Sequence, residues 1–98
     1  MSKAEKKEIL TKLVQDFLTA TNLETLIKIR QEIVNFFLSS NFIDHSKKDI
    51  ADTALLLVGN EMSKYIIEAS NKNISKETKL EINNSCVLLL TIFDLTTI

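Results

Sequence analysis

The sequence predicts an all-α fold, a single antiparallel four-helix bundle. The chain has 98 residues, of which 45% are hydrophobic and 26% charged, the balance of one small globular domain. It contains no proline and one glycine, so strand-rich folds, which need frequent tight turns, fit poorly. Apolar residues recur at spacings of three and four in four segments, and this is the period of amphipathic helices.

The amino-terminal half predicts two helices, over residues 3–19 and 22–38. Residues 2–5 read Ser-x-x-Glu and residues 21–24 read Thr-x-x-Glu, and both have the form of a capping box that starts a helix. The connection between the helices is short, which favours antiparallel neighbours. The second helix is apolar over a broad face, which predicts contact with two neighbours, or with one neighbour and a partner.

The carboxyl-terminal half predicts two more helices, over residues 46–70 and 76–94. The first contains Gly59, which is expected to allow a close helix crossing or a slight bend. The second follows Ser75, a favourable N-cap residue. Its apolar run, at residues 86–93, is far shorter than the roughly 20 residues that span a bilayer. We therefore expect a buried bundle helix and no transmembrane segment.

The segment before the third predicted helix contains Asp44, His45 and Ser46, the residue types of a hydrolase triad. A triad needs these groups to converge from separate positions. We therefore interpret the segment as a cap, in which Asp44 or Ser46 starts the third helix. The preceding Phe42 and Ile43 are expected to fold back onto the core. His45 is the only histidine, which excludes a multi-histidine metal site.

The composition argues against several other kinds of site. One glycine cannot build a glycine-rich phosphate loop, and the aspartates do not have the spacing of a calcium-binding loop. The formal net charge of −1 argues against nucleic acid as a partner. Cys86 is the only cysteine, and we expect a small buried hydrophobe in a reducing, cytoplasmic environment. We expect no catalytic site, cofactor or metal, and a protein that acts by binding.

Residues 58–93 read VGNEMSKYIIEASNKNISKETKLEINNSCVLLLTIF. This stretch contains a Met-Ser-Lys run at residues 62–64, an Asn-containing turn, an Ile-Ser step at residues 74–75 and a last helix that ends in alternating Leu and Ile. In these features it resembles the carboxyl-terminal half of the enterocin A type of immunity proteins, which protect lactic acid bacteria and streptococci from pediocin-like bacteriocins. The resemblance implies a cytosolic four-helix bundle without enzymatic activity. Such a protein recognises a bacteriocin-occupied mannose phosphotransferase permease at the inner face of the membrane and blocks the pore.

The joint between the last two predicted helices, NKNISKET at residues 71–78, is the candidate recognition surface. In the family, the carboxyl-terminal half largely sets which bacteriocin is resisted. The polar residues at and just after this joint offer a surface to a partner protein, and the resemblance implies that the recognition region is the last helical hairpin with the end of its second helix. The candidate partner-binding residues are Asn71, Lys72, Asn73, Lys76, Lys79, Phe93 and Asp94. From the residues alone, the joint also fits a solvated helix turn.

A second hypothesis also fits four amphipathic helices. A small regulatory or adaptor protein would act through protein contacts, and the broad apolar face of the predicted helix 22–38 would join two copies as a homodimer. The two hypotheses place the partner on different surfaces, the joint at residues 71–78 or the face of the second helix.

Overall fold

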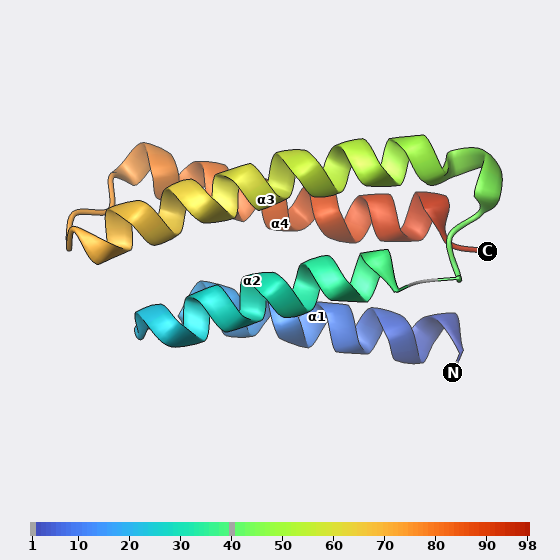
Figure 1. Ribbon diagram of the computed structural model, residues 1–98, viewed down its shortest axis with the longest axis horizontal. Helices are drawn as coiled ribbons and strands as arrows, with labels where there is room; N and C mark the ends of the chain where they lie inside the picture. Colours follow the sequence, from blue (N-terminus) through green and yellow to red (C-terminus); the bar gives the residue numbers. More distant parts are fainter. Residues whose placement is uncertain (1, 40) are drawn as a thin grey trace.

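The computed structural model describes residues 2–39 and 41–98. These residues form four α-helices and one 3-10 helix, in an antiparallel four-helix bundle, as predicted (Figure 1). The helix bounds lie within two residues of the predicted ones. The elements are α1 (Lys3–Thr19), α2 (Leu23–Leu38), η1 (His45–Lys47), α3 (Lys48–Ser70) and α4 (Lys76–Thr96).

The two helical hairpins differ in length. Helix α3 has 23 residues and α2 has 16, which correspond to about 35 Å and about 24 Å. At the left of Figure 1, the α3–α4 turn therefore extends beyond the α1–α2 turn. We call this the hinge end, and we call the opposite end, where both chain termini lie, the terminal end.

The core runs along the bundle axis and takes apolar side chains from all four helices. Phe36, Phe42 and Phe93 form an aromatic cluster near the terminal end, with ring centroids 5.2 to 6.1 Å apart. Phe42 and Ile43 pack against the core, as predicted. The main core cluster comprises Leu10, Val14, Phe17, Leu26, Ile29, Ile33, Phe37, Leu55, Val58, Met62, Ile82, Cys86, Leu89 and Phe93.

The starts of α1 and α4 follow the sequence signals, and the predicted start of α2 needs a correction. The capping box at residues 2–5 is complete, with both reciprocal hydrogen bonds. The capping box predicted at residues 21–24 is wrong, because α2 begins one residue later. The side chain of Asn22 caps α2 and accepts a hydrogen bond from the backbone N–H of Thr25 at 3.3 Å. Asparagine serves as an N-cap as well as threonine does, so the local pattern allowed both starts.

Gly59 makes room for a side chain from α2. It is buried, and a Cβ atom at this position would lie 3.3 Å from Nη2 of Arg30. Nε of Arg30 donates a hydrogen bond to the Gly59 carbonyl oxygen at 3.1 Å. The close approach at this glycine is therefore between its backbone and the guanidinium of a neighbouring helix, which is not the close helix crossing or bend that we predicted.

The bundle also closes on itself at the terminal end. Ile43 and Thr97 form an isolated antiparallel bridge, so the loop before η1 pairs with the end of the chain. Within the described residues, none of the helices has both the length and the apolar character that a membrane crossing requires.

Candidate functional site at the hinge end

The α3–α4 turn contains a lysine in the left-handed backbone conformation. Lys72 has a φ of 56°. Its N–H donates to the carbonyl of Ala69 at 3.0 Å, and the N–H of Asn73 donates to the carbonyl of Glu68 at 3.1 Å. This is the hydrogen-bond pattern of a Schellman motif, whose left-handed position usually holds glycine. A Cβ atom is crowded in this conformation, so the backbone of Lys72 is sterically strained and the strain lowers the stability of the turn.

A hydrogen-bond network ties the end of α3 to the start of α4. Ser75 is the N-cap of α4, as predicted, and its hydroxyl accepts from the N–H of Thr78 at 3.0 Å. The carboxylate of Glu68 accepts from the N–H of Ser75 at 3.0 Å and from the Thr78 hydroxyl at 2.5 Å. These bonds, that from the Ser75 backbone first, lower the pKa of Glu68. The turn is therefore held by its own side chains.

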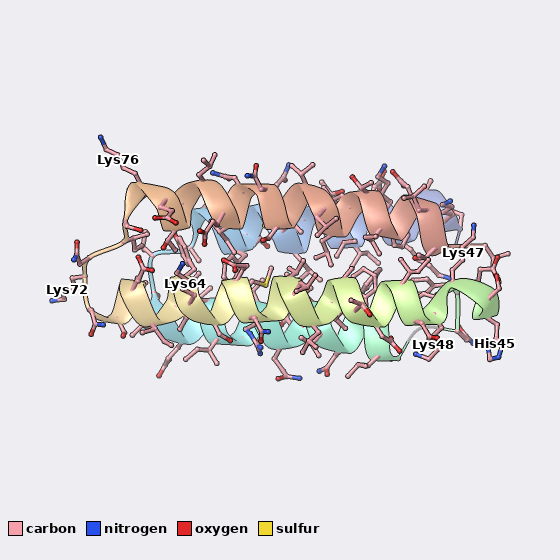
Figure 2. The ribbon with its side chains drawn as sticks, turned by 90° about the horizontal axis from the view of Figure 1, so that it is seen from above. His45, Lys47, Lys48, Lys64, Lys72 and Lys76 are labelled. Carbon is pink, nitrogen blue, oxygen red and sulfur yellow. The ribbon has the colours of Figure 1, made fainter. Side chains whose placement is uncertain are left out.

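The lysines of the turn point into solvent. Lys72, Lys76 and Lys79 are exposed, and they form no ion pair within residues 2–39 and 41–98. Figure 2 shows Lys72 at the tip of the hinge and Lys76 directed away from the bundle. Asn71 and Asn73 are exposed beside them. Five of the seven predicted partner-binding residues thus lie together at the hinge end, with three uncompensated positive charges.

A cavity of about 460 Å³ opens between the two turns. Lys72, Asn73 and Lys79 line it on the α3–α4 side, and Thr21 lines it on the α1–α2 side. The ring of Tyr65, also in its lining, is anchored against another ring at a centroid distance of 5.5 Å. Two lysines and no carboxylate contribute to the lining, so the site favours carboxylate or carbonyl groups of a partner.

Sequence reasoning missed the contributions of Thr21 and Tyr65 to this cavity. Thr21 lies far from the α3–α4 turn in sequence, near the start of α2, and only the packing of the shorter hairpin against the longer one brings it to the lysines. Tyr65 lies on α3, seven residues before Lys72, where its place on an apolar face predicts only a packing role.

Phe93 and Asp94 lie at the other end of the molecule. They are separated from the start of α4 by about 25 Å of helix. Phe93 is 0% exposed and belongs to the aromatic cluster, so it cannot contact a partner while the bundle is folded. Asp94 forms an ion pair with Lys7 at 2.7 Å. The predicted set therefore does not form one surface, and the hinge end keeps only its first five residues.

The Asp-His-Ser segment is a cap, as predicted, but for η1 and not for α3. The Asp44 carboxylate accepts from the Ser46 N–H at 3.0 Å and from its hydroxyl at 2.9 Å. These bonds, that from the hydroxyl first, lower the pKa of Asp44. His45 is exposed. Helix α3 begins after Lys47, whose side chain makes no capping bond, because the 3-10 turn already leads the chain into the helix.

Cys86 is buried in the core, as predicted. Burial raises the pKa of its thiol to about 11, which disfavours the reactive thiolate. In the described part of the chain, no three His, Cys, Asp or Glu side chains gather in a way that could hold a metal ion.

No protein-family model matches the chain, and comparisons with curated proteins and with solved structures give no significant match.

Proposed function

We propose that this protein is a bacteriocin immunity protein. It is a non-enzymatic binder that acts at the cytoplasmic face of the membrane, where it recognises a mannose phosphotransferase permease occupied by a pediocin-like bacteriocin and blocks the pore. The observation that carries this proposal is the hinge end, where the lysines Lys72 and Lys79, which form no ion pair with the described residues, line one side of a cavity. The four-helix bundle and the resemblance of residues 58–93 support it.

The hinge end suits recognition of a partner with exposed carbonyl and carboxylate oxygens. Lysine places a compact charge with three donors on a flexible stem, and three such stems leave the same rim of the bundle. The network around Glu68 holds the backbone beneath them. A preordered backbone lowers the entropy lost on binding. Lysines on one end also attract the anionic cytoplasmic leaflet, which supports peripheral association with the membrane.

Protection of living cells tests the function. We expect a bacteriocin-sensitive strain that expresses this protein to survive at least one member of a panel of pediocin-like bacteriocins. If all members kill this strain as readily as they kill cells that carry an empty vector, the proposal of an immunity function is overturned.

Charge removal at the hinge end tests the site. Replacing Lys72, Lys76 and Lys79 together by glutamine should lower protection without loss of helicity in circular dichroism. The matched control replaces three exposed lysines away from the hinge end, Lys12, Lys28 and Lys48, and should protect as the wild type does. Equal protection by both triple variants would show that the recognition site is not at the hinge end.

The alternative function is that of a small helical regulatory or adaptor protein. The observation in its favour is on another face, where Leu38 and Leu56 are exposed on α2 and α3. The neighbouring reading frame distinguishes the two functions. A small secreted peptide with a double-glycine leader in that frame supports immunity, and a regulatory target there supports the adaptor.

A further inference from the structure

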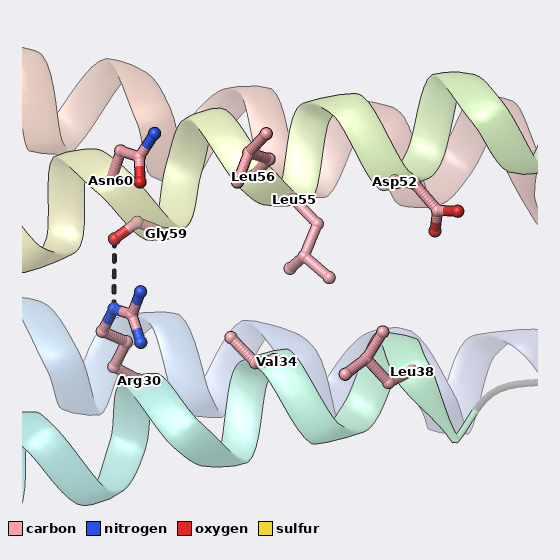
Figure 3. A pocket seen from close by; sticks show the side chains of 8 residues that line it. All are labelled: Arg30, Val34, Leu38, Asp52, Leu55, Leu56, Gly59 and Asn60. Carbon is pink, nitrogen blue, oxygen red and sulfur yellow. Dashed lines mark hydrogen bonds between the residues drawn. The ribbon is translucent and has the colours of Figure 1, made fainter.

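An apolar groove of about 300 Å³ runs between α2 and α3 (Figure 3). Its apolar lining comes from Val34 and Leu38 on α2 and from Leu55 and Leu56 on α3. Arg30 lies at one end of the groove, on α2, and Asp52 lies at the other end, on α3. The groove thus carries opposite charges at opposite ends, on opposite helices.

The apolar surface continues beyond the groove. Leu38 and Leu56 are each 65% exposed, and Ile27 and Ile67 are 55% and 61% exposed. Ile27 precedes Val34 by seven residues, or two helical turns, so it lies on the same side of α2. Contiguous exposed apolar side chains bordered by polar groups are typical of a protein interface.

Arg30 lacks a counter-charge. Its side chain is half-buried, and its Nε donates to the Gly59 carbonyl. Among the residues that the structure describes, no carboxylate lies within ion-pair distance of its guanidinium. A half-buried charge without a partner is unfavourable, so this site is suited to an incoming carboxylate. Asp52 pairs with Lys48 of its own helix, at 3.2 Å, and such an exposed pair contributes little to stability.

We propose that this groove binds a second copy of the chain in an antiparallel two-fold dimer, in which Arg30 of each copy pairs with Asp52 of the other. The two-fold axis lies in the plane of the interface, perpendicular to the line that joins Arg30 to Asp52, and passes through the middle of the groove. Rotation about this axis turns the second copy face to face with the first and exchanges the positions of Arg30 and Asp52. It therefore places each arginine over the aspartate of the other copy, and the leucines of the two copies against each other.

A second copy fits this surface better than a small carboxylate ligand does. A ligand held in the groove would neutralise Arg30 and leave Leu38 and Leu56 largely in water. A second copy covers these leucines and also uses Asp52. A stable interface buries about 800 Å² on each partner, and a bundle 40 Å long and 22 Å wide offers a face large enough to supply it.

Charge reversal tests the reciprocal pairing. Sedimentation of the wild type between about 1 µM and about 1 mM should show a monomer–dimer equilibrium. Arg30→Asp and Asp52→Arg, each alone, should weaken self-association at least about tenfold, because each homodimer then carries two like-charged pairs. An equimolar mixture of the two variants restores both pairs and should dimerise as the wild type does. Lys28→Asp and Glu8→Arg, with the same charge changes outside the groove, should leave dimerisation unchanged.

An apolar pair of variants keeps the test independent of Arg30. Leu56→Glu should give a monomer with intact helicity, since this leucine is already 65% exposed, and Leu80→Glu, at 63% exposed on α4, should still dimerise. A wild type that stays monomeric over the whole range overturns the dimer. Single charge variants that dimerise normally, or a mixture that stays monomeric, overturn the pairing of Arg30 with Asp52.

Discussion

Lys72 occupies a backbone position that glycine occupies without a steric cost. Its φ of 56° places its Cβ atom close to the following carbonyl. Backbone strain of this kind persists where the surrounding structure holds it, and it often marks functional sites. In the proposed immunity protein, this strained position places a lysine charge at the tip of the hinge.

Lys72→Gly separates these two roles. We expect the free energy of unfolding to rise by about 1 kcal/mol, because glycine relieves the left-handed strain. Urea denaturation measures it. Lys79→Gly is the control, since the same change within α4 should lower stability by about 1 kcal/mol. If the Lys72→Gly variant is more stable but protects cells less well, the lysine side chain takes part in binding. If the variant is less stable than the wild type, the backbone of Lys72 is not strained.

Glu61 on α3 faces a second carboxylate across the α3–α4 interface. Oε2 of Glu61 is buried and accepts no hydrogen bond from the described residues. The Glu81 carboxylate, which the protonated form of Glu61 can hydrogen bond, raises the pKa of Glu61 above 4.5, and burial adds to the rise. Lys64, 3.0 Å from Glu81, is the first cause of the lowered pKa of Glu81. Above its raised folded-state pKa, Glu61 therefore carries a charge that the folded state disfavours.

Glu61→Gln should raise the melting temperature near neutral pH, because an amide donates to Glu81 without a charge. A raised folded-state pKa means that Glu61 destabilises the fold above that pKa, and that protonation removes the penalty as the pH falls. The advantage of the variant should therefore shrink towards about pH 4. Thermal unfolding at several pH values measures the difference in melting temperature between the variant and the wild type. Glu8→Gln, which changes an exposed carboxylate on α1, is the control. An equal, pH-independent gain in both variants would contradict the repulsion between Glu61 and Glu81.

At the scale of elements, the α3–α4 hairpin depends on one buried hydroxyl. Thr78 is 1% exposed, accepts from the Ser75 hydroxyl at 2.9 Å, and donates to Glu68. It thus joins the N-cap of α4 to the last turn of α3. The helix dipole favours the negative charge of Glu68 at the start of α4. The rigid presentation of the hinge lysines follows from this contact.

Thr78→Val keeps the shape of this side chain and removes both of its hydrogen bonds. We expect a loss of about 1–2 kcal/mol in the free energy of unfolding, because Glu68 and Ser75 lose a buried partner. Amide hydrogen exchange should also become faster at the start of α4. Thr91→Val removes an exposed hydroxyl that bonds only to its own helix at 2.9 Å and should change stability by less than about 0.5 kcal/mol. Equal effects of the two variants would show that the hairpin does not need the Thr78 contact.

At the scale of the whole molecule, the closed bundle controls access to Cys86. Its thiol lies among the core residues, and burial raises its pKa to about 11. The thiolate is the reactive form, so reaction with a disulfide reagent needs the bundle to open. The four helices therefore protect this one side chain together.

The rate of thiol labelling measures this protection. At mildly alkaline pH, Cys86 in the native protein should react at least about 100-fold more slowly than in urea-unfolded protein. The urea concentration at which labelling becomes fast should match the loss of helicity. Fast labelling of the fully helical protein would show that α4 opens locally around Cys86.

Local sequence signals predicted the helices closely because each acts within one turn. The hydroxyl of Ser2 and the carboxylate of Glu5 need only each other to start α1, and Ser75 needs only the next residues of α4. Where two local signals competed, at Thr21 and Asn22, propensity did not decide between them.

The candidate site was predicted less completely, because a surface is a property of packing. The five polar residues of the turn were predicted from one continuous stretch, and they do lie together at the hinge end. Phe93 and Asp94 belong to the same predicted helix, but the length of α4 carries them to the terminal end, where Phe93 enters the core. Thr21 and Arg30 show no local sign of the cavity and the groove that they line.

By itself, the sequence determined four amphipathic helices, their caps, the buried cysteine and a polar hinge, because hydrophobic period and capping are local properties. Only the tertiary structure decided that the longer hairpin extends beyond the shorter one and that Lys72 and Lys79 line the cavity between the two turns. It also decided that Arg30 meets the Gly59 backbone beside an uncovered apolar groove. These features join residues distant in the chain, and their positions depend on how whole helices pack.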